Sequence, residues 1–210
     1  MTPGIGHRTV RNVIYSRLGL STARPKHGSL RLTLQIKRAG RHGGVMDNRE
    51  QVEAFIKQNF SSYKNVRIEV NMLHLDTTSI PDQVRTLAKT DIYFSSAGSG
   101  LYMSSLLPDD TIVIGMPRCN RMPLPVNARE LRPGVDGQAQ DALFSSCSGF
   151  YEFQHIQTLS NVHLIPFPLG AISLRLDDPN HYNLPISYLN ETLTIAIEEA
   201  LALREAVLKA

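Results

Sequence analysis

Short apolar segments alternate with helical patterns through the first 116 residues, and this alternation constrains the fold more than any other feature. The segments predicted as strands are 29–38, 66–73, 91–96 and 111–116. The last of them, "TIVIGM", is apolar throughout, as is typical of a central parallel strand that is covered on both faces. Strands that alternate with helices at these lengths favour a parallel sheet with right-handed crossovers. We therefore expect an α/β fold, a Rossmann-like parallel sheet with flanking helices.

The helical patterns have recognisable ends and apolar stripes. Residues 7–20 end at Gly19, and their apolar positions at helical spacing are Val10, Val13, Ile14 and Leu18. Asp47 and Glu50 form an N-terminal cap pattern for a helix whose stripe is Val52, Phe55, Ile56 and Phe60. Ser79 is expected to cap a short helix with Pro81 in its first turn. A further short helix is expected over 101–107.

A chain of 210 residues is long enough for one sizeable core, and we expect a single domain over 1–210 with its core at about 28–116. Residues 117–148 are rich in Pro and Arg and are predicted to be an irregular excursion. A late strand is expected within 161–169 and a C-terminal helix over about 187–208. The stripe of that helix is Leu189, Leu193, Ile197, Ala200, Leu201 and Leu208.

No apolar run reaches the roughly 18–20 residues that span a bilayer, so we expect no membrane span in this chain. The first ten residues lack the apolar stretch of a signal peptide, so no targeting signal is expected in this sequence either. Cys119 and Cys147 are the only cysteines, and they could form one bridge in an oxidising compartment.

Basic residues are concentrated at the start of the chain. Residues 1–50 contain ten Lys and Arg and two acidic residues, although the whole chain has a net charge of only +3. A basic block of this kind favours an anionic partner, or is simply a solvated face. Because RNA-binding aromatic signatures, zinc-ligand spacings and a clear helix-turn-helix pattern are lacking, a phosphate-bearing small molecule is at least as good a candidate as a nucleic acid.

Two loops follow predicted strands, where ligands bind in open α/β sheets. The loop from Arg38 to Gly44 offers Arg38 and Arg41, whose planar guanidinium groups suit phosphate. In the turn from Ala97 to Gly100, the two glycines let backbone N–H groups approach a ligand, and Ser99 adds a hydroxyl. Together the loops predict a diphosphate pocket, although a glycine turn after a strand is also common as a purely structural feature. Neither loop matches the GxGxxG or P-loop pattern, which disfavours a dinucleotide enzyme or a P-loop ATPase.

The order and spacing of these loops resemble the family 61 glycosyltransferases. "IKRAGRHGGVMDNREQVEAFI" is similar to the family's arginine-rich segment, in which a strand runs into Arg-x-x-Arg, then an Asn, an acidic residue and a helix. "SIPDQVRTLAKTDIYFSSAGSGLYMSSLLPDDTIVI" is similar to a second signature that contains a His-Gly-Ala-Gly-Leu turn. Across residues 8–120, the matching positions include Gln83, Asp91, Gly98, Gly100, Leu101, Leu107, Pro108 and Ile114.

The resemblance implies the donor-binding lobe of a two-lobed GT-B enzyme, which transfers a sugar with inversion from a nucleotide sugar, expected to be a UDP-sugar, to a glycan or protein acceptor. It assigns Arg38, Arg41 and the turn Gly98–Leu101 to the donor diphosphate, with no cofactor. It also implies work in the Golgi or endoplasmic reticulum lumen and an acceptor-side lobe before residue 1. In this sequence Ala97 stands where the family has the turn's histidine, and Gly115 where it has an acidic residue.

These departures keep alternatives open: a non-catalytic α/β module, or a decayed glycosyltransferase, that binds a phosphorylated ligand. A nucleic-acid-binding domain would rest on the basic N-terminal block alone, and we expect no nucleic acid partner. Further acid, base or phosphate-contact candidates, each of which also has an ordinary structural interpretation, are His42, Asp82, Asp91, Arg118, Arg121, Arg129, Glu152 and His155. His155 and His163 lack companion ligands, which disfavours a metal site.

Overall fold

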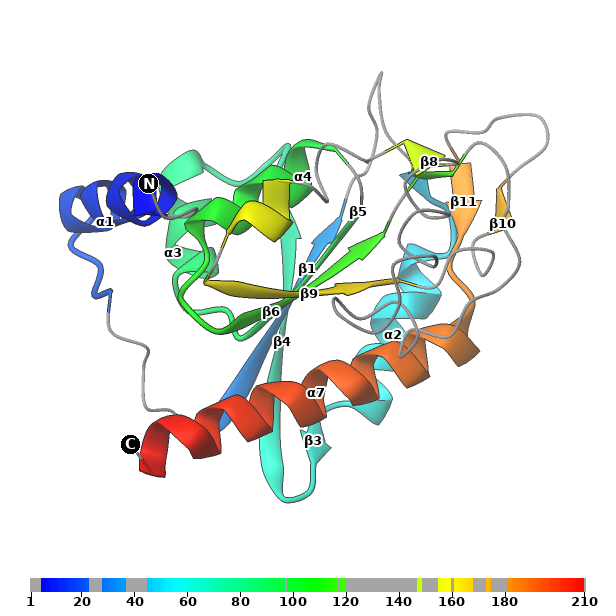
Figure 1. The fold of residues 1–210 in the computed structure, drawn as a ribbon. Helices are drawn as coiled ribbons and strands as arrows, with labels where there is room; N and C mark the ends of the chain where they lie inside the picture. The colour runs from blue at the N-terminus through cyan, green and yellow to red at the C-terminus, as the bar shows by residue number, and fades with distance from the viewer. Residues whose placement is uncertain are drawn as a thin grey trace.

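A six-stranded sheet forms the middle layer of the protein, with helices packed on both faces (Figure 1). The computed structural model describes residues 5–22, 28–36, 45–96, 98–116, 118–119, 147–148, 155–159, 161–167, 173–174 and 181–209. In spatial order the strands are β3 (Ser62–Tyr63), β4 (Val66–His74), β1 (Ser29–Ile36), β5 (Ile92–Ser96), β6 (Thr111–Met116) and β9 (Val162–Pro166). All neighbouring pairs are parallel except β3–β4. The expected α/β, Rossmann-like fold is confirmed.

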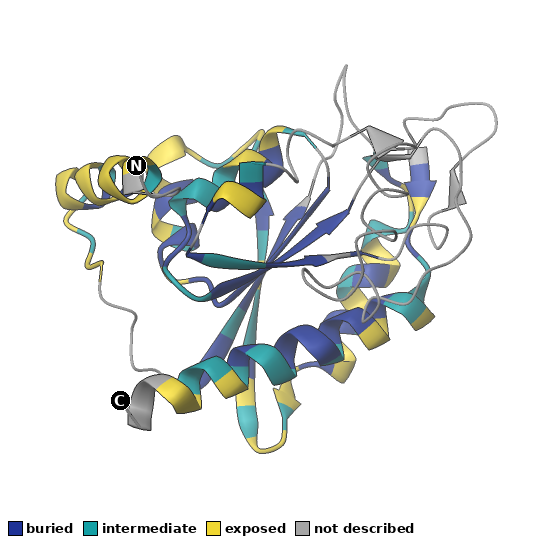
Figure 2. Cartoon of the chain, in the orientation of Figure 1, coloured by how far each residue is buried: buried dark blue, intermediate teal, exposed yellow. Residues whose placement is uncertain are grey.

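The central strands are buried on both faces, as their sequences predict. Every residue of β6 is buried, and Figure 2 shows the same for its neighbour β5. β1 alternates between leucines on one face and polar residues on the other, and Thr33 and Gln35 on the polar face are also buried. The hydroxyls of Thr33 and Thr90 lie 2.7 Å apart there. The polar side of β1 therefore faces the protein interior, where its groups need partners.

Helices α2 (Arg49–Asn59) and α7 (Ile186–Lys209) cover one face of the sheet (Figure 1). Their apolar stripes pack against the leucines of β1 and the alternate residues of β5 and β6 in one continuous core. Of the stripe predicted for the C-terminal helix, four residues are fully buried, namely Leu189, Leu193, Ile197 and Ala200. Leu201 is partly buried, and the side chain of Leu208 lies outside the described residues.

The other face carries α1 (Ile5–Arg17), α3 (Ile80–Leu87), α4 (Ser99–Tyr102) and the 3-10 helix η1 (Met103–Leu106). The predicted cap of α3 is confirmed, because the Ser79 hydroxyl oxygen accepts the Asp82 N–H at 3.3 Å. The short helix expected over 101–107 begins earlier, at Ser99, and tightens into η1. It ends at Leu106, and Leu107 after it adopts an extended conformation (ψ 152°) because Pro108 follows.

The first helix is present, but only half of its predicted apolar stripe packs inward: Ile14 and Leu18 are partly buried against α3, whereas the two valines are not. Val10 and Val13 are 59% and 50% exposed, whereas Arg11 and Tyr15 are buried. The Tyr15 hydroxyl donates to a backbone carbonyl of η1 at 2.6 Å, and Arg11 pairs with Asp109 at 2.7 Å. A tyrosine ring buries more apolar surface than a valine, and both polar ends find partners, so this face of α1 packs inward.

A small sheet stands beside the carboxyl ends of the main strands. It contains β10 (Ser173–Leu174), β11 (His181–Asn183) and β2 (Val45–Met46). The cap pattern predicted from Asp47 and Glu50 was wrong: the N-cap residue of α2 is Asn48, and its side chain makes no cap hydrogen bond. Instead, the Asn48 amide donates to the Leu184 carbonyl at 2.8 Å and accepts its N–H at 2.9 Å. This pair of bonds fastens α2 to the start of α7.

Most of the predicted excursion over 117–148 lies outside the described residues. Two short strands, β7 (Arg118–Cys119) and β8 (Cys147–Ser148), pair in antiparallel fashion, and their register sets Cys119 opposite Cys147.

Candidate functional site

The strand order defines one edge of the sheet as the expected place for a ligand. From β1 the chain crosses to β4 on one side and then returns to β5 on the other, so the winding reverses between β1 and β5. In open parallel sheets ligands bind beyond the carboxyl ends of the strands at such a reversal. Here those ends are Ile36 and Ser96, and Figure 1 shows the two arrowheads on the same edge. We call this region the β1–β5 edge.

The glycine turn at this edge has a geometry that only glycine provides. Gly98 has φ 112° and ψ −156°, a combination essentially closed to residues with a side chain. Gly100 is packed against the strands: an added Cβ would lie 2.5 Å from Ser95 Oγ and 2.8 Å from Gln35 Cδ. The Tyr93 hydroxyl holds the Gly100 carbonyl at 2.8 Å, and burial raises the pKa of that hydroxyl, which keeps it a donor.

The other two residues predicted in the turn are in different environments. Ser99 is exposed, so its hydroxyl is accessible to a ligand. The Leu101 side chain is fully buried in the core beneath α3 and α4, and its N–H donates to the Gly98 carbonyl at 3.0 Å. The Leu101 amide is thus used within the turn, and the groups left to face a ligand are the backbone of 98–100 and the Ser99 hydroxyl.

Gln35 and Ser95 belong to this edge and were missed in the sequence. Gln35 is only 4% exposed, and its amide oxygen accepts the Ser95 hydroxyl at 2.9 Å. Its amide nitrogen Nε2 is buried and has no hydrogen-bond partner within the described part of the chain. The available signal was a polar residue near the end of a buried strand, although alternation alone assigns it to an ordinary polar face.

The predicted arginines, Arg38 and Arg41, lie outside the described residues, as does Ala97. The segment that carries them leaves β1 at Ile36 and returns at β2, and β2 pairs in parallel with β11. On β11, the buried Tyr182 hydrogen bonds with Ser96 at the end of β5, and burial raises the pKa of its hydroxyl. Both ends of the arginine-bearing segment are therefore anchored at the β1–β5 edge.

The remaining acid and base candidates that the structure describes lie away from this edge. Asp91 is buried at the opposite end of β5, where it accepts the Arg31 backbone N–H and pairs with Arg204, each at 2.7 Å. Asp82 is exposed on α3. Another residue matched to the family signature, Gln83, donates to the Leu75 and Thr78 carbonyls, which is a structural role. His42, Arg121, Arg129 and Glu152 lie outside the described residues, as does the side chain of Arg118.

His155 lies in an aromatic cluster on the α1 side of the protein. Its ring centroid is 5.0 Å from that of His7 and 5.2 Å from that of Tyr102. Burial lowers the pKa of His155, and the neighbouring His7 lowers it further, so the ring is neutral near pH 7. Within the described residues, no group of three or more His, Cys, Asp or Glu side chains could hold a metal ion.

A doubly wound α/β domain with a glycine turn at its β1–β5 edge belongs to the class of Rossmann-like ligand-binding folds. The sequence model of one family, Glycosyltransferase 61, matches residues 1–114, from α1 almost to the end of β6. The chain therefore belongs to the glycosyltransferase 61 family, as the resemblance in its sequence indicated. A comparison with curated proteins gives no match.

Family membership supports glycosyltransferase activity in general, with a sugar donor and an acceptor as partners. Proteins of this family typically work in the secretory pathway. None of the helices in the described residues is long and apolar enough to cross a membrane.

Proposed function

We propose that this chain binds the donor of an inverting glycosyltransferase, a nucleotide sugar and specifically a UDP-sugar, at the β1–β5 edge. One observation carries the proposal: β1 and β5, the strands that precede the two loops singled out in the sequence, are parallel neighbours in the sheet. The chain leaves β1 just before Arg38 and Arg41, and it leaves β5 just before Gly98–Leu101, at adjacent positions of the sheet. The family match covers both loops.

In this proposal the two loops act on the donor diphosphate in different ways. Arg38 and Arg41 supply positive charge and paired N–H donors to the phosphate oxygens. The backbone of 98–100 supplies close-range donors, and the Ser99 hydroxyl supplies one more. As the bond from the sugar to the diphosphate breaks, these groups offset the negative charge that develops on the departing nucleoside diphosphate. The base that activates the acceptor hydroxyl would come from elsewhere, such as the other lobe of a GT-B enzyme.

In this proposal the donor site also includes Gln35, which lies on β1 against Gly100 of the glycine turn. The Gln35 amide nitrogen has no partner among the described residues, and a buried amide nitrogen left without one costs about 1–3 kcal/mol, so an acceptor from outside these residues is expected. A phosphate or hydroxyl oxygen of the donor would serve as that acceptor. The transfer itself, to a glycan or protein acceptor in the Golgi or endoplasmic reticulum lumen, follows from the family resemblance.

Calorimetry with UDP and UDP-sugars tests the donor proposal directly. We expect wild-type protein to bind, and the double variant Arg38→Ala/Arg41→Ala to lose binding because two charge-assisted contacts disappear. A matched control, Arg17→Ala/Lys57→Ala, removes the same charge at exposed positions of α1 and α2 and should bind normally. Absence of heat with every nucleoside diphosphate would overturn the proposal.

Gln35→Leu provides a second, independent test. Leucine has a similar size and removes the nitrogen that lacks a partner among the described residues, but it also removes the acceptor of the Ser95 hydroxyl. That hydroxyl can still donate to the Ser96 carbonyl at 3.1 Å, so the ligand-free protein should be about as stable as wild type. UDP affinity should fall by about tenfold, the equivalent of one lost hydrogen bond of about 1.4 kcal/mol. Unchanged affinity in a well-folded Gln35→Leu protein would remove Gln35 from the site.

A further inference from the structure

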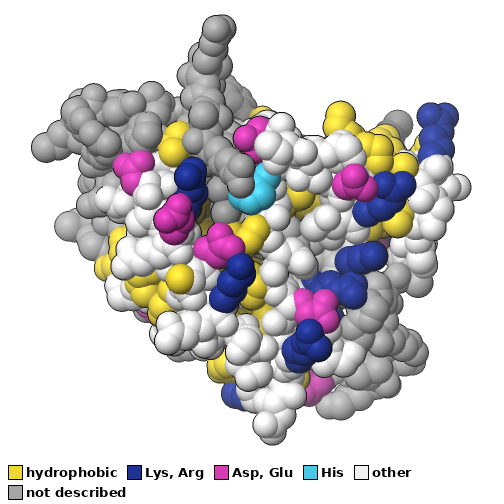
Figure 3. Space-filling view, turned by 180° about the vertical axis from the view of Figure 1, so that it is seen from behind, with side chains coloured by type: hydrophobic (Ala, Val, Ile, Leu, Met, Phe, Trp, Pro, Cys, Tyr) yellow, Lys and Arg dark blue, Asp and Glu magenta, His cyan; other side chains and the backbone are white. Residues whose placement is uncertain are grey.

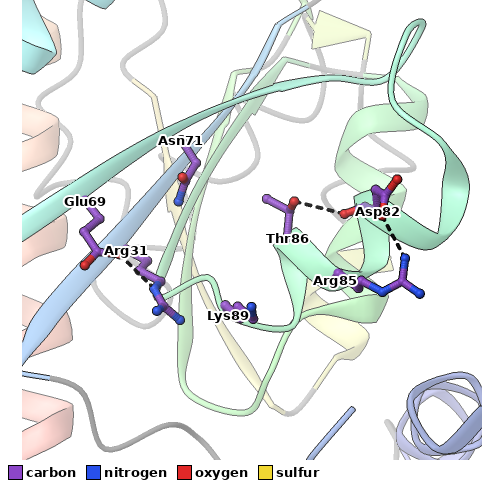
Figure 4. Close-up of a pocket in the computed structure, with 7 residues that line it drawn as sticks. All are labelled: Arg31, Glu69, Asn71, Asp82, Arg85, Thr86 and Lys89. Atoms are coloured by element: carbon purple, nitrogen blue, oxygen red, sulfur yellow. Dashed lines mark hydrogen bonds and ion pairs between the residues drawn. The ribbon is translucent and has the colours of Figure 1, made fainter. Parts of the chain in front are cut away.

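A concavity lies between the sheet and α3, toward the amino ends of β1 and β4. Its volume is about 350 Å³, at the lower end of the range of ligand pockets. Figure 4 shows the side chains that line it: Arg31, Glu69 and Asn71 from the strands, and Asp82, Arg85, Thr86 and Lys89 from α3 and the turn after it. Arg31 is four residues before Gln35 on β1, about 13 Å along the strand, so this Arg31–Lys89 pocket is separate from the β1–β5 edge.

The two carboxylates of the pocket already have partners. Glu69 accepts hydrogen bonds from Arg31 Nε and the Ser29 hydroxyl, both at 3.1 Å. Asp82 accepts the Ser79 hydroxyl at 2.6 Å and an Arg85 N–H at 2.7 Å. The bond from Arg31 lowers the pKa of Glu69 most, and the bond from Ser79 lowers the pKa of Asp82 most. Both carboxylates are therefore ionised at neutral pH, and their oxygens already accept hydrogen bonds from neighbouring side chains.

The groups that remain unengaged are hydrogen-bond donors. Arg31 Nη1 is buried and has no partner among the described residues. Lys89 is exposed and forms no ion pair there, and the Asn71 side chain forms no hydrogen bond there. With Arg85 included, three cations face two carboxylates, which leaves one positive charge. Basic and acidic side chains are interspersed on the face seen in Figure 3.

We propose that the Arg31–Lys89 pocket binds an oxyanion: a phosphate, a sulfate or a carboxylate, either free or carried on a sugar. The oxyanion would accept hydrogen bonds from Arg31 Nη1 and from the Lys89 ammonium group, and the Asn71 amide would donate to a further oxygen. Arg31 is well placed for this because the contacts of its Nε with Glu69 and of its backbone with Asp91 fix it before a ligand arrives. The site is partly exposed, so its affinity falls as salt is added.

The test is an amide-shift titration of the isotope-labelled full chain at low ionic strength, without nucleotide. Inorganic phosphate, inorganic sulfate, glucuronate and neutral glucose are added separately. We expect saturable shifts at Asn71 and Lys89 with the anions and none with glucose. Tighter binding of glucuronate than of phosphate and sulfate assigns the pocket to an acidic sugar, and the reverse order assigns it to a free anion. No saturable shift with any anion, or equal shifts with glucose, overturns the proposal.

Matched variants separate the pocket from general surface charge. Lys89→Met should weaken anion binding by about tenfold, the loss expected for one charge-assisted hydrogen bond, with little change in stability because Lys89 is exposed. Lys57→Met removes an exposed lysine from α2 and should leave binding unchanged. Equal weakening by both variants overturns the proposal. Arg38→Ala/Arg41→Ala should retain phosphate binding in this pocket, so failure at the β1–β5 edge is distinguishable from failure here.

Discussion

Gly100→Ala tests whether the glycine turn is held against the strands as closely as the structure indicates. The new Cβ would overlap the Gln35 amide oxygen and lie 2.5 Å from Ser95 Oγ. Overpacking a core by one methyl group costs roughly 1–3 kcal/mol, and the helical preference of alanine returns about 0.5–1 kcal/mol. We therefore expect a net loss of about 1–2 kcal/mol in the free energy of unfolding, measured by urea denaturation.

The double variant Gly100→Ala/Gln35→Ala identifies the cause of that loss. Shortening Gln35 removes the nearest obstructing atoms, so the two substitutions together should cost less than the sum of the single costs. Gly28→Ala is the control, since a Cβ there meets nothing within 4 Å. A Gly100→Ala protein as stable as wild type, or strict additivity with Gln35→Ala, would refute the close approach of the turn to β1.

Three further predictions concern parts of the fold that support the sites. Arg204→Met should lower the free energy of unfolding by about 3 kcal/mol in urea denaturation, because it removes a cation from the buried Asp91 carboxylate; a loss as small as that of an exposed ion pair would contradict this. Ser79→Ala should cost about 1 kcal/mol through loss of the α3 cap, and a helix signal in circular dichroism and a urea midpoint equal to wild type would argue against it. The pKa of Glu69 lies below its ordinary 4.5, and that of Asp82 below its ordinary 3.8, because each carboxylate accepts hydrogen bonds in the folded protein. The stability that these bonds contribute is present above the ordinary pKa values and should be lost as the pH falls through the lower pKa values of the folded state. Glu69→Gln should flatten this acid dependence, and an unchanged profile in urea titrations from neutral to acid pH would count against the role of the Arg31–Glu69 pair.

Sequence patterns predicted elements best where one physical requirement dominated. The wholly apolar run of β6 had to be buried on both faces, and Ser79 with Pro81 had to begin a helix, and both are found. At α1 the apolar pattern was only partly correct, because Ile14 and Leu18 pack inward but Val10 and Val13 are exposed. Arg11 and Tyr15 are buried because their polar ends meet the Leu106 and Leu107 carbonyls and the Asp109 carboxylate, and such partners are distant in sequence.

Local sequence was also insufficient to predict the start of α2. Asp47 and Glu50 matched a local cap pattern, but Asn48 bonds to Leu184, a residue 136 positions away. At the β1–β5 edge, local sequence identified the glycines. Only the packing of β1 against β5 showed that Gln35 contacts Gly100 and that its amide nitrogen has no partner among the described residues.

The sequence by itself determined the α/β class, the order of the main helices and of the five long strands, and the two loops that mark the family, because periodicity and turn chemistry are local properties. The tertiary structure decided which face of α1 packs inward, which polar groups of β1 find partners, and that Arg31 and Lys89 line one pocket. These outcomes depend on hydrogen bonds and steric contacts between residues far apart in the chain. The free energies of these long-range contacts are comparable to those of local helix and strand preferences. The three-dimensional arrangement therefore decides which contacts form.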